Sequence, residues 1–490
     1  MSNDERATQT LGDVSHAEFR AQLHRIADWI ADYREHISQR RISPQEPPGA
    51  IAAALPHSAP AQPEPFDAIV ADLDRVIVPG LVHWGHPAFF GYFGSTTTAP
   101  GILGEMIAAA LNVSAMTWRT SPAATELEAV VLDWLRQMLH LSHNHKGIVY
   151  DTASVATLHA LAAAREGLGL DVRKSGLAGR SSLPQMKIYA SDQAHSSIEK
   201  AAITLGIGEH NVVRVVTDAE YRMVPAALEA EILKDMARGH LPCAVVATVG
   251  TTSTTSVDPV EAIAAVCEKH GIWLHVDAAY GGAMALLPEG RWAMAGVDAA
   301  DSVVVNPHKW LFVPLDFSAL YTRRPEMLRA VFALTPEYLR GDAAAEADNY
   351  MDYGIQLGRR FRALKAWMVL RTFGEEGLRA RIREHIRLAR LLEGWIHSHA
   401  DFEVVAPVVM AVVCFSARRG GRSAPAPDRL NEDIVNCVNA SGEAYLTHTR
   451  LRGRTAIRFA IGNVLTTEAH VLACWQLVQA VFARSAQHGE

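Results

Sequence analysis

Apolar positions recur at helical spacing in two stretches near the start of the chain. The apolar side chains between Phe19 and Tyr33 predict a helix over 16–38, and a second pattern predicts one over 67–78. The stretch between them is rich in proline, which interrupts helices, so we expect an extended connector there. Two helices cannot bury an apolar stripe by themselves. We therefore expect residues 1–98 to form an N-terminal helical arm that packs on another body, preferably a second subunit.

Short apolar runs alternate with helical stretches over residues 99–370. This alternation predicts a large α/β domain around a mostly parallel sheet that is covered on both faces. Ligands bind at the carboxyl ends of the strands in such sheets, and polar clusters follow five of the runs. The sequence therefore predicts one site at that edge. The runs are GIVY at 147–150, MKIYA at 186–190, VVRVV at 212–216, CAVVATV at 243–249, IWLHV at 272–276 and SVVV at 302–305.

The pattern changes again after about residue 370. A long, charge-rich helical stretch covers 379–399, and apolar runs typical of strands follow at 408–415 and 455–461. A polar stretch rich in glycine and proline separates the first of these runs from the next helical pattern. We expect residues 371–490 to form a small α+β C-terminal domain.

Composition narrows the class of protein. The 490 residues are 49% apolar and 20% charged, which allows a large core and two or three domains. A net charge of −7 gives no basic field for nucleic acid, and no run is apolar enough to predict a membrane helix. The polar start of the chain does not resemble an export signal. Five cysteines without a CxxC pair suit a reducing compartment, so we expect a cytoplasmic protein.

Lys309 and Asp277 form the pair with the clearest chemical meaning. Lys309 follows the run SVVV, and Asp277 ends the preceding run, about one crossover unit earlier. Both side chains should therefore emerge at the same edge of the sheet. A lysine facing a buried carboxylate across a ring suits pyridoxal phosphate, because the carboxylate keeps the pyridine nitrogen protonated. The alternatives are a surface lysine, and a helix cap or metal ligand for the aspartate.

The junction between the run GIVY and the next helical stretch suits a phosphate. Thr152, Ala153 and Ser154 would offer amide and hydroxyl donors at a helix N-terminus. Serine and threonine caps are common, so this signal is weak by itself. Asn306 and His308, on either side of a proline beside the lysine, offer further contacts to a phosphate or a carboxylate.

Other site types find little support in the sequence. His140, His143 and His145 lack a carboxylate or cysteine at ligand spacing, so we predict a solvated turn and no metal. The pair Gly206 and Gly208 lacks the third glycine and the preceding strand of a dinucleotide site. The chain contains no GxSxG elbow, which argues against a serine hydrolase of that type.

Seven stretches spread over nearly the whole chain carry a family resemblance. They are PGLVHWGHPAFFGYF (79–93), SPAATELE (121–128), SDQAHSSIEKA (191–201), ATVGTTSTTSVD (247–258), WLHVDAAYGG (273–282), ADSVVVNPHKWL (300–311) and LGRRFRALKAW (357–367). With these stretches in this order, the chain resembles the group II pyridoxal-phosphate decarboxylases, specifically the aromatic-L-amino-acid decarboxylases.

The resemblance implies a fold and a set of cofactor contacts. The fold would be the aspartate-aminotransferase type, fold type I, with a mostly parallel seven-stranded central sheet and an intertwined homodimer. Lys309 would be the Schiff-base lysine, Asp277 the partner of the pyridine nitrogen, and His195 the residue stacked on the ring. The remaining implied contacts are Ala153 and Ser154 at the phosphate, His308 close to the imine and phosphate, and Thr252 and Ala279 beside the cofactor.

The resemblance also implies a proton donor and an aromatic substrate pocket. Tyr338 matches the donor, within a polar, weakly patterned stretch that suits a mobile loop; relatives with phenylalanine there tend to form aldehydes. Gly358 matches a position where relatives that accept indoles tend to have glycine, which favours tryptophan over phenylalanine, tyrosine or dihydroxyphenylalanine. The other implied pocket residues are Trp84, Tyr92, Phe93, Ser95 and Met116, some of them from the partner subunit.

The expected activity is removal of the α-carboxylate from an aromatic L-amino acid, giving an arylethylamine and CO₂. One alternative is an aldehyde synthase, which would release hydrogen peroxide and ammonia. The other is a non-catalytic scaffold, against which the intact set of Lys309, Asp277, His195 and Tyr338 argues. Taken singly, aromatic and histidine residues are as simply explained by core or loop packing.

Overall fold

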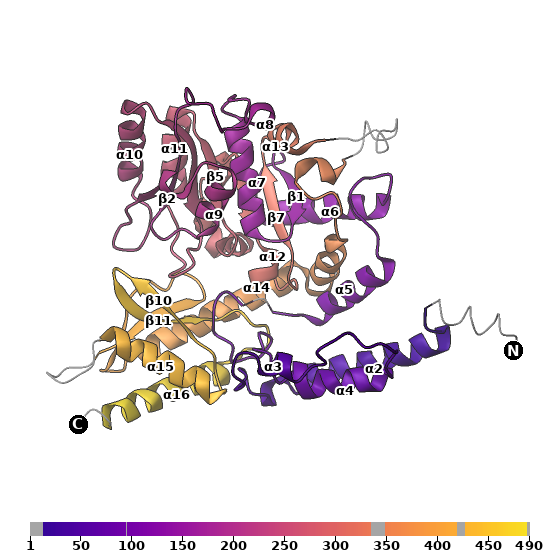
Figure 1. Cartoon of the computed structure of the whole chain (residues 1–490). Coiled ribbons are helices and arrows are strands. Elements are labelled where there is room, and N and C mark those ends of the chain that lie inside the picture. The colour runs from indigo at the N-terminus through magenta and orange to yellow at the C-terminus, as the bar shows by residue number, and fades with distance from the viewer. Residues whose placement is uncertain (1–12, 95, 335–347, 419–426, 488–490) are drawn as a thin grey trace, which may run out of the picture.

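The computed structural model describes residues 13–94, 96–334, 348–418 and 427–487. A large sheet domain lies above a smaller domain, and the N-terminal arm extends beside the smaller domain (Figure 1). No helix in these four ranges is long and apolar enough to cross a membrane.

The large domain is built on a seven-stranded sheet with the order β1-β7-β6-β5-β4-β2-β3. The strands β6, β5, β4, β2 and β3 run parallel, whereas β7 is antiparallel to both of its neighbours. The predicted mostly parallel seven-stranded sheet is therefore confirmed, although no apolar run in the sequence marked β7. The strands are β1 (Lys146–Tyr150), β2 (Met186–Ser191), β3 (Val212–Val215), β4 (Leu241–Thr248), β5 (Trp273–Asp277), β6 (Ser302–Val305) and β7 (Ser318–Thr322).

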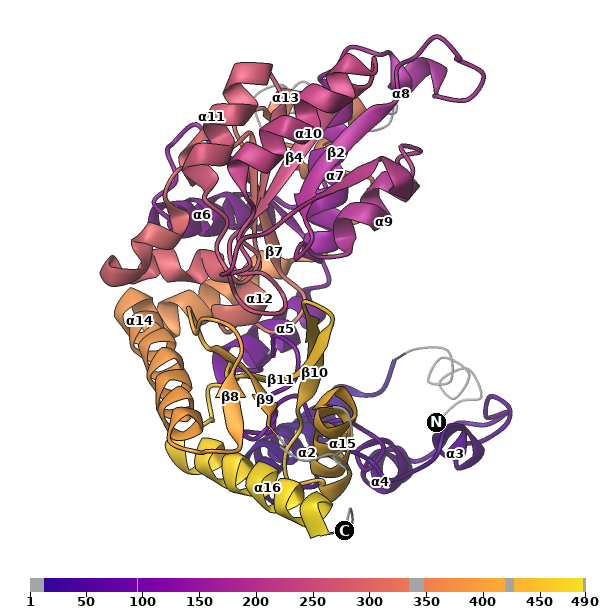
Figure 2. The ribbon, with the colours of Figure 1, turned by 90° about the vertical axis from the view of Figure 1, so that its left-hand side faces the viewer.

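Helices cover both faces of this sheet, as continuous apolar strands require (Figure 2). One face carries α7 (Ala153–Glu166), α9 (Ser197–Thr204) and α13 (Pro325–Phe332), and the other carries α6 (Pro122–Met138), α10 (Pro225–Ala237) and α11 (Val260–His270). The remaining elements of this part are α5 (Ala99–Leu111), α8 (Val172–Ser175), η3 (Glu209–Asn211), η4 (Gly281–Leu286), η5 (Pro288–Met294), η6 (Val297–Ala299), α12 (Pro307–Trp310) and η9 (Tyr350–Tyr353).

A long helix, α14 (Arg362–His397), leads from the large domain into the small one. Gly374 interrupts it with a φ of 61°, a backbone conformation that glycine adopts without a steric penalty. The boundary predicted after residue 370 falls within this helix and stays a prediction. The small domain is an antiparallel sheet, in the order β10-β11-β9-β8, covered by helices. Its elements are β8 (Phe402–Val404), β9 (Val412–Ala417), α15 (Pro427–Ser441), β10 (Thr447–Leu451), β11 (Arg454–Ala460) and α16 (Glu468–Gln487).

The N-terminal arm begins with α2 (His16–Glu35), whose first turn is capped by the Ser15 hydroxyl. Backbone hydrogen bonds tie the end of the arm to its own small domain, for example from Phe90 to Tyr445. No residue of α2 is buried in the single chain, and Phe19 is 54% exposed. The proline-rich connector, expected to be extended, contains one short alanine helix. The further arm elements are η1 (Ile37–Gln39), α3 (Ala50–Ala53), α4 (Phe66–Asp72) and the π-helical turn η2 (Leu73–Ile77).

Candidate active site

A cavity of about 210 Å³ lies at the carboxyl ends of the central strands. It gathers the segments that follow β1, β2, β4, β5 and β6, which are the five polar clusters singled out in the sequence. All ten predicted cofactor residues line it, together with Phe93. The lining residues are Phe93, Thr152, Ala153, Ser154, His195, Thr248, Gly250, Thr252, Asp277, Ala279, Tyr280, Asn306, His308 and Lys309.

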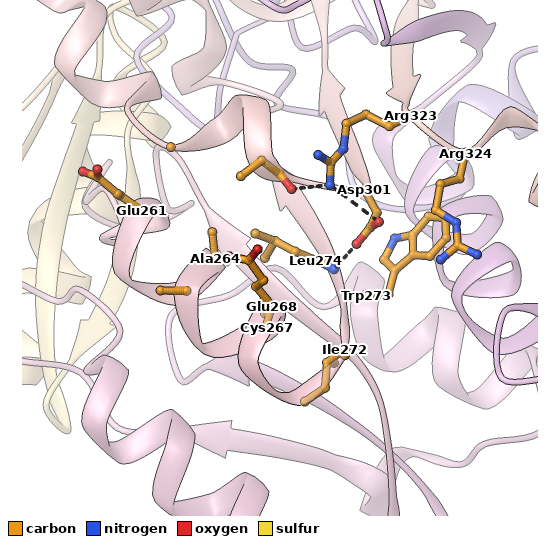
Figure 3. A pocket seen from close by; sticks show the side chains of 14 residues that line it. Glu261, Ala264, Cys267, Glu268, Ile272, Trp273, Leu274, Asp301, Arg323 and Arg324 are labelled. Carbon is orange, nitrogen blue, oxygen red and sulfur yellow. Dashed lines mark hydrogen bonds and ion pairs between the residues drawn. The ribbon is translucent and has the colours of Figure 1, made fainter.

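A larger cavity, of about 590 Å³, lies at the opposite ends of β5 and β6 (Figure 3). Both of its arginines are engaged with neighbouring protein groups: Arg323 donates to the carbonyl of Ala299 at 2.6 Å, and Arg324 lies 5.3 Å from the Trp273 ring centroid. Among the residues that the structure describes, no lysine, no histidine and no predicted site residue lines it. Chemistry, and not volume, therefore identifies the smaller cavity as the candidate site.

Lys309 reaches this cavity from α12, directly after β6. Its Nζ lies 5.3 Å from the centroid of the Phe93 ring. Burial lowers the pKa of Lys309, and the positive charge of Arg458 lowers it further, while Asp277 opposes the change. A lower pKa raises the fraction of neutral amine, which is the form that attacks a carbonyl carbon.

Asp277 is the last residue of β5 and is 8% exposed. Its Oδ1 accepts a hydrogen bond from the Ala279 amide at 3.0 Å. On the neighbouring strand its register partner is Thr248, whose Oγ1 is buried and has no hydrogen-bond partner among the described residues. No group of three or more histidine, cysteine or acidic residues in the described ranges is arranged to hold a metal ion.

Two histidines line the cavity with different hydrogen bonds. His195, in the turn after β2, accepts from the Ser197 amide at Nδ1, 3.1 Å away. Partial burial lowers the pKa of His195, and Asp277 opposes that effect. Burial lowers the pKa of His308 to about 3, and its Nδ1 accepts from the Phe317 amide at 2.9 Å. His308 is therefore neutral near pH 7, and its hydrogen lies on Nε2, which can donate to a ligand.

The N-terminus of α7 opens onto the same cavity. Thr152 caps the helix, with its Oγ1 accepting from the Val155 amide at 3.5 Å. The amides of Ala153 and Ser154 belong to the first turn, which has no intrahelical acceptors and favours an anion. Asn306 accepts from the Ser318 hydroxyl at 2.7 Å, and this bond fixes the Asn306 side chain at the wall.

Aromatic rings form one wall of the site. Phe93 stacks on Tyr280 with centroids 3.9 Å apart, and Tyr280 stacks on Trp310 at 4.7 Å. The rings make the side of the cavity near Lys309 apolar. Tyr280, Thr248 and Gly250 lie within the stretches that carry the family resemblance, but no pattern in the sequence marked them as site residues.

Arg458 of β11 is a further residue that the sequence analysis missed. Its guanidinium carbon lies 4.7 Å from the Phe93 centroid, and it donates to the carbonyls of Thr252 at 2.9 Å and Tyr92 at 2.6 Å. The residue is 4% exposed, and neither an ion pair nor a partner for Nη2 is found among the described residues. The sequence does mark Arg458 as unusual, because it is the single charged residue inside the apolar run TAIRFAI.

The turns after β4 and β5 approach each other closely beside the site. Gly250 has a φ of 88°, and a Cβ atom there would lie 2.9 Å from the Gly281 amide nitrogen. A Cβ on Gly281 would lie 2.4 Å from the Val249 carbonyl oxygen. Glycine at both positions therefore lets the turn that carries Thr252 and the turn that carries Ala279 meet at one cavity.

The predicted substrate residues are not gathered at this cavity by the single chain. Only Phe93 lines it. Trp84 and Tyr92 stack on each other at 5.4 Å and are 42% and 50% exposed. Met116 and Gly358 lie beside a backbone hydrogen bond that joins the chain segments containing them, from the Ala115 amide to the Arg359 carbonyl. Ser95 and Tyr338 lie outside the described residues.

Comparison with known proteins identifies the family. Residues 48–418 match the conserved domain of the pyridoxal-dependent decarboxylases. The chain belongs to this family. The tryptophan decarboxylase TDC2 of Camptotheca acuminata is 38% identical over 94% of this chain and 94% of its own length. A phenylacetaldehyde synthase of a Rosa hybrid cultivar is also 38% identical, over 94% of this chain and 93% of its own length.

Solved structures agree with this assignment. The crystal structure of Oryza sativa TDC with PLP and tryptamine has a TM-score of 0.92 and 38% sequence identity, and the match covers 96% of this chain and 99% of that one. The fold is therefore fold type I, and this decarboxylase uses pyridoxal phosphate. The residues present fit that cofactor, because one cavity offers an amine, a carboxylate, a helix N-terminus and an unpartnered buried hydroxyl on Thr248.

Proposed function

We propose that this decarboxylase acts on aromatic L-amino acids, with tryptophan favoured, and releases the arylethylamine and CO₂. The observation that carries the proposal is that Lys309 and Asp277 line one cavity together with the first turn of α7. Relatives named as tryptophan decarboxylases support the aromatic substrate class. The test is a panel of L-amino acids with amine and CO₂ quantified, in which an aromatic member should give the highest kcat/KM.

In this proposal each cavity residue holds one part of the cofactor. Lys309 would bind it covalently, the Asp277 carboxylate would keep the pyridine nitrogen protonated, and His195 would contact the ring. When bound, pyridoxal phosphate supplies an electron sink for the electron pair that the departing CO₂ leaves behind. The phosphate is bound by the amides of Ala153 and Ser154, with Thr152, Asn306 and His308 beside it, while Thr252 and Ala279 flank the cofactor.

The surroundings of the cavity suit both the binding of a substrate carboxylate and its loss as CO₂. Arg458 is a buried cation without a carboxylate partner among the described residues, and it lies behind the Phe93 ring. Its charge attracts the substrate carboxylate, because charges act more strongly in surroundings of low dielectric constant. The aromatic wall excludes water, which favours conversion of the charged group into neutral CO₂.

Replacing Arg458 with methionine is expected to raise KM by about tenfold, or about 1.4 kcal/mol of electrostatic attraction acting across the Phe93 ring. Arg458→Lys keeps the charge and should retain much of the affinity. Steady-state kinetics with the best aromatic substrate would measure both. An unchanged KM in the methionine variant would show that the charge does not assist substrate binding.

Tyr338 is proposed to protonate the α-carbon after CO₂ leaves. Tyr338→Phe removes the acidic proton while keeping the ring, so amine formation should fall by about 100-fold. The product should shift toward aldehyde, with O₂ and water consumed and CO₂, hydrogen peroxide and ammonia released. Equal amine yields from the variant and the wild-type enzyme would remove Tyr338 from this role.

The same measurement separates the two enzymatic alternatives. The similarity to a phenylacetaldehyde synthase keeps oxidative deamination as the second candidate. A wild-type enzyme that forms amine without hydrogen peroxide is a decarboxylase, and one that forms aldehyde as its main product is a synthase. The scaffold alternative predicts neither product, and the family match together with the retained site residues argues against it.

The substrate pocket is proposed to form between two subunits of a homodimer. Four predicted pocket residues, Trp84, Tyr92, Met116 and Gly358, lie outside the cavity of the single chain, so a partner subunit would have to supply some of them. The apolar stripe of α2, exposed in the single chain, offers a surface for that partner.

We propose a reducing, cytoplasmic location for the enzyme. The five free cysteines support this location.

Gly358→Ser tests the selection of indole substrates. A Cβ atom at Gly358 would have no heavy atom within 4 Å in the single chain, so folding should be unaffected. The added hydroxymethyl group should lower kcat/KM for tryptophan about tenfold more than for phenylalanine, because the indole needs more room. Equal losses on both substrates would contradict the assignment of Gly358 to the pocket.

A further inference from the structure

His159 is a buried histidine in the middle of α7 that the proposed chemistry does not use. Its side chain is fixed on all sides: Nδ1 donates to the Val155 carbonyl at 2.6 Å, and Nε2 accepts from the Ile355 amide at 3.1 Å. The ring stacks on Tyr150 at 4.5 Å and contacts Phe332 at 4.6 Å between centroids. One side chain therefore contacts the helix of the phosphate site and two segments far from it in sequence.

Those two segments bracket the stretch that carries Tyr338. Phe332 is the last residue of α13, on one side of that stretch, and Ile355 lies on the other side, just after η9. The Tyr150 hydroxyl donates to the Tyr353 carbonyl, which adds a second fixed point next to the first. Residues 353–355 are thus held directly against β1 and α7.

Gly354 packs closely against the rings of His159 and Tyr150, so a larger residue at position 354 would press on both. A Cβ atom on Gly354 would lie 3.0 Å from His159 Nε2 and 3.1 Å from the Tyr150 ring. The next fixed point along the chain is Arg359, which donates to Glu128 at 2.6 Å and to the Val149 carbonyl at 2.9 Å. Gly358 lies between these anchors, so the path of the chain there is set from both ends.

The protonation state of His159 suits an acceptor. Burial lowers the pKa of His159 to about 4, and the nearby Asp151 carboxylate opposes that change. The ring is therefore neutral near pH 7, and its hydrogen lies on Nδ1 because that atom faces the Val155 carbonyl. Nε2 is left with a free lone pair for the Ile355 amide.

We propose that His159 is a positioning residue for decarboxylation, because it holds residues 353–355 against the cofactor-binding helix and so fixes the path of the chain to Gly358. The proposal rests on the proposed function, in which Gly358 contacts the substrate. His159 lies six residues after Ala153, whose amide is the first one proposed to bind the phosphate. The two residues are therefore about 9 Å apart along the helix axis. It acts through the backbone it holds and not by touching the reacting atoms.

Two variants separate positioning from packing. His159→Phe keeps a ring of similar size but leaves the Ile355 amide without its acceptor. His159→Gln offers a side-chain oxygen at a similar reach and serves as the matched control. For the holoenzyme, His159→Phe should lower kcat for amine formation about tenfold, the effect of one lost buried hydrogen bond, with KM changing less. His159→Gln should stay closer to the wild-type value.

Two further readouts test the mechanism of the effect. Amide hydrogen exchange in residues 353–358 should be faster in His159→Phe than in His159→Gln, and the ratio of kcat/KM for tryptophan to kcat/KM for phenylalanine should change only in His159→Phe. The cofactor absorbance should be the same in all three proteins. Wild-type turnover and exchange in His159→Phe would overturn the inference, and so would equal losses in both variants accompanied by loss of bound cofactor.

The substrate assignment and the positioning role of His159 can be refuted separately. If the wild-type enzyme decarboxylates a non-aromatic amino acid, the substrate assignment is wrong, and the same pair of variants is then compared on that amino acid. If the wild-type enzyme and Tyr338→Phe behave as expected while His159→Phe matches the wild type, the proposed function stands and the positioning role of His159 is refuted.

Discussion

Replacing Lys309 with alanine is expected to abolish decarboxylation, with kcat/KM falling by at least about 1,000-fold, or about 4 kcal/mol of transition-state stabilisation. The amine of Lys309 lines the cavity together with Asp277, and no other lysine does so. Its burial lowers its pKa and keeps more of it in the reactive neutral form. Without it the enzyme loses the covalent anchor of the cofactor and the amine that exchanges with the substrate.

The measurement combines kinetics with mass spectrometry. After borohydride reduction, the wild-type protein should carry the cofactor on residue 309, and Lys309→Ala should carry none there. Lys269→Ala is the matched control, because Lys269 is exposed and pairs with Glu229 at 2.7 Å far from the cavity. That variant should retain wild-type activity. Full turnover by Lys309→Ala would refute the site assignment.

Asp277→Asn is expected to lower kcat by about 100-fold, or about 3 kcal/mol. Asparagine matches aspartate in size and can still accept from the Ala279 amide, so the change removes the charge alone. The pyridine nitrogen would lose its anionic partner, and the ring would accept electrons less readily. Loss of the carboxylate also removes the effect that raises the pKa of Lys309, so this pKa should fall further.

The conservative variant Asp277→Glu keeps the charge and should retain more activity than Asp277→Asn. Bound cofactor and thermal stability should be measured for both, since a general loss of folding would lower them together. If Asp277→Asn turns over at the wild-type rate, the carboxylate does not act on the cofactor. If both variants lose activity equally, the geometry of the side chain matters more than its charge.

Much of the site could be predicted because its residues follow strands. Lys309 and Asp277 come directly after apolar runs, and the carboxyl ends of parallel strands meet at one edge whatever the lengths of the helices between them. The same argument gathered Thr152, while the family resemblance implied His195 and Thr252, and the structure places all three on the same cavity. Local patterns carry this information because strand ends need no long-range contact to be recognised.

Residues brought in from other parts of the fold could not be predicted in this way. Arg458 comes from a strand of the small domain, and only the docking of that domain places it behind Phe93. In the sequence, His159 looks like an ordinary core position of α7, and only the structure shows that it accepts a hydrogen bond from the Ile355 amide. Neither contact leaves a local pattern, because each joins segments about 200 or more residues apart in the chain.

The sequence by itself determined the alternation of strands and helices, the mostly parallel sheet and the cluster of polar strand ends, because each depends on periodicity and on residues that follow a strand directly. Tertiary structure alone decided that β7 enters the sheet antiparallel, which of two cavities gathers the reactive groups, and which predicted pocket residues lie outside it in the single chain. The physical reason is that these features depend on packing between segments that are distant in the sequence. Burial and close contact decide how such segments pack, and the local sequence pattern does not predict it.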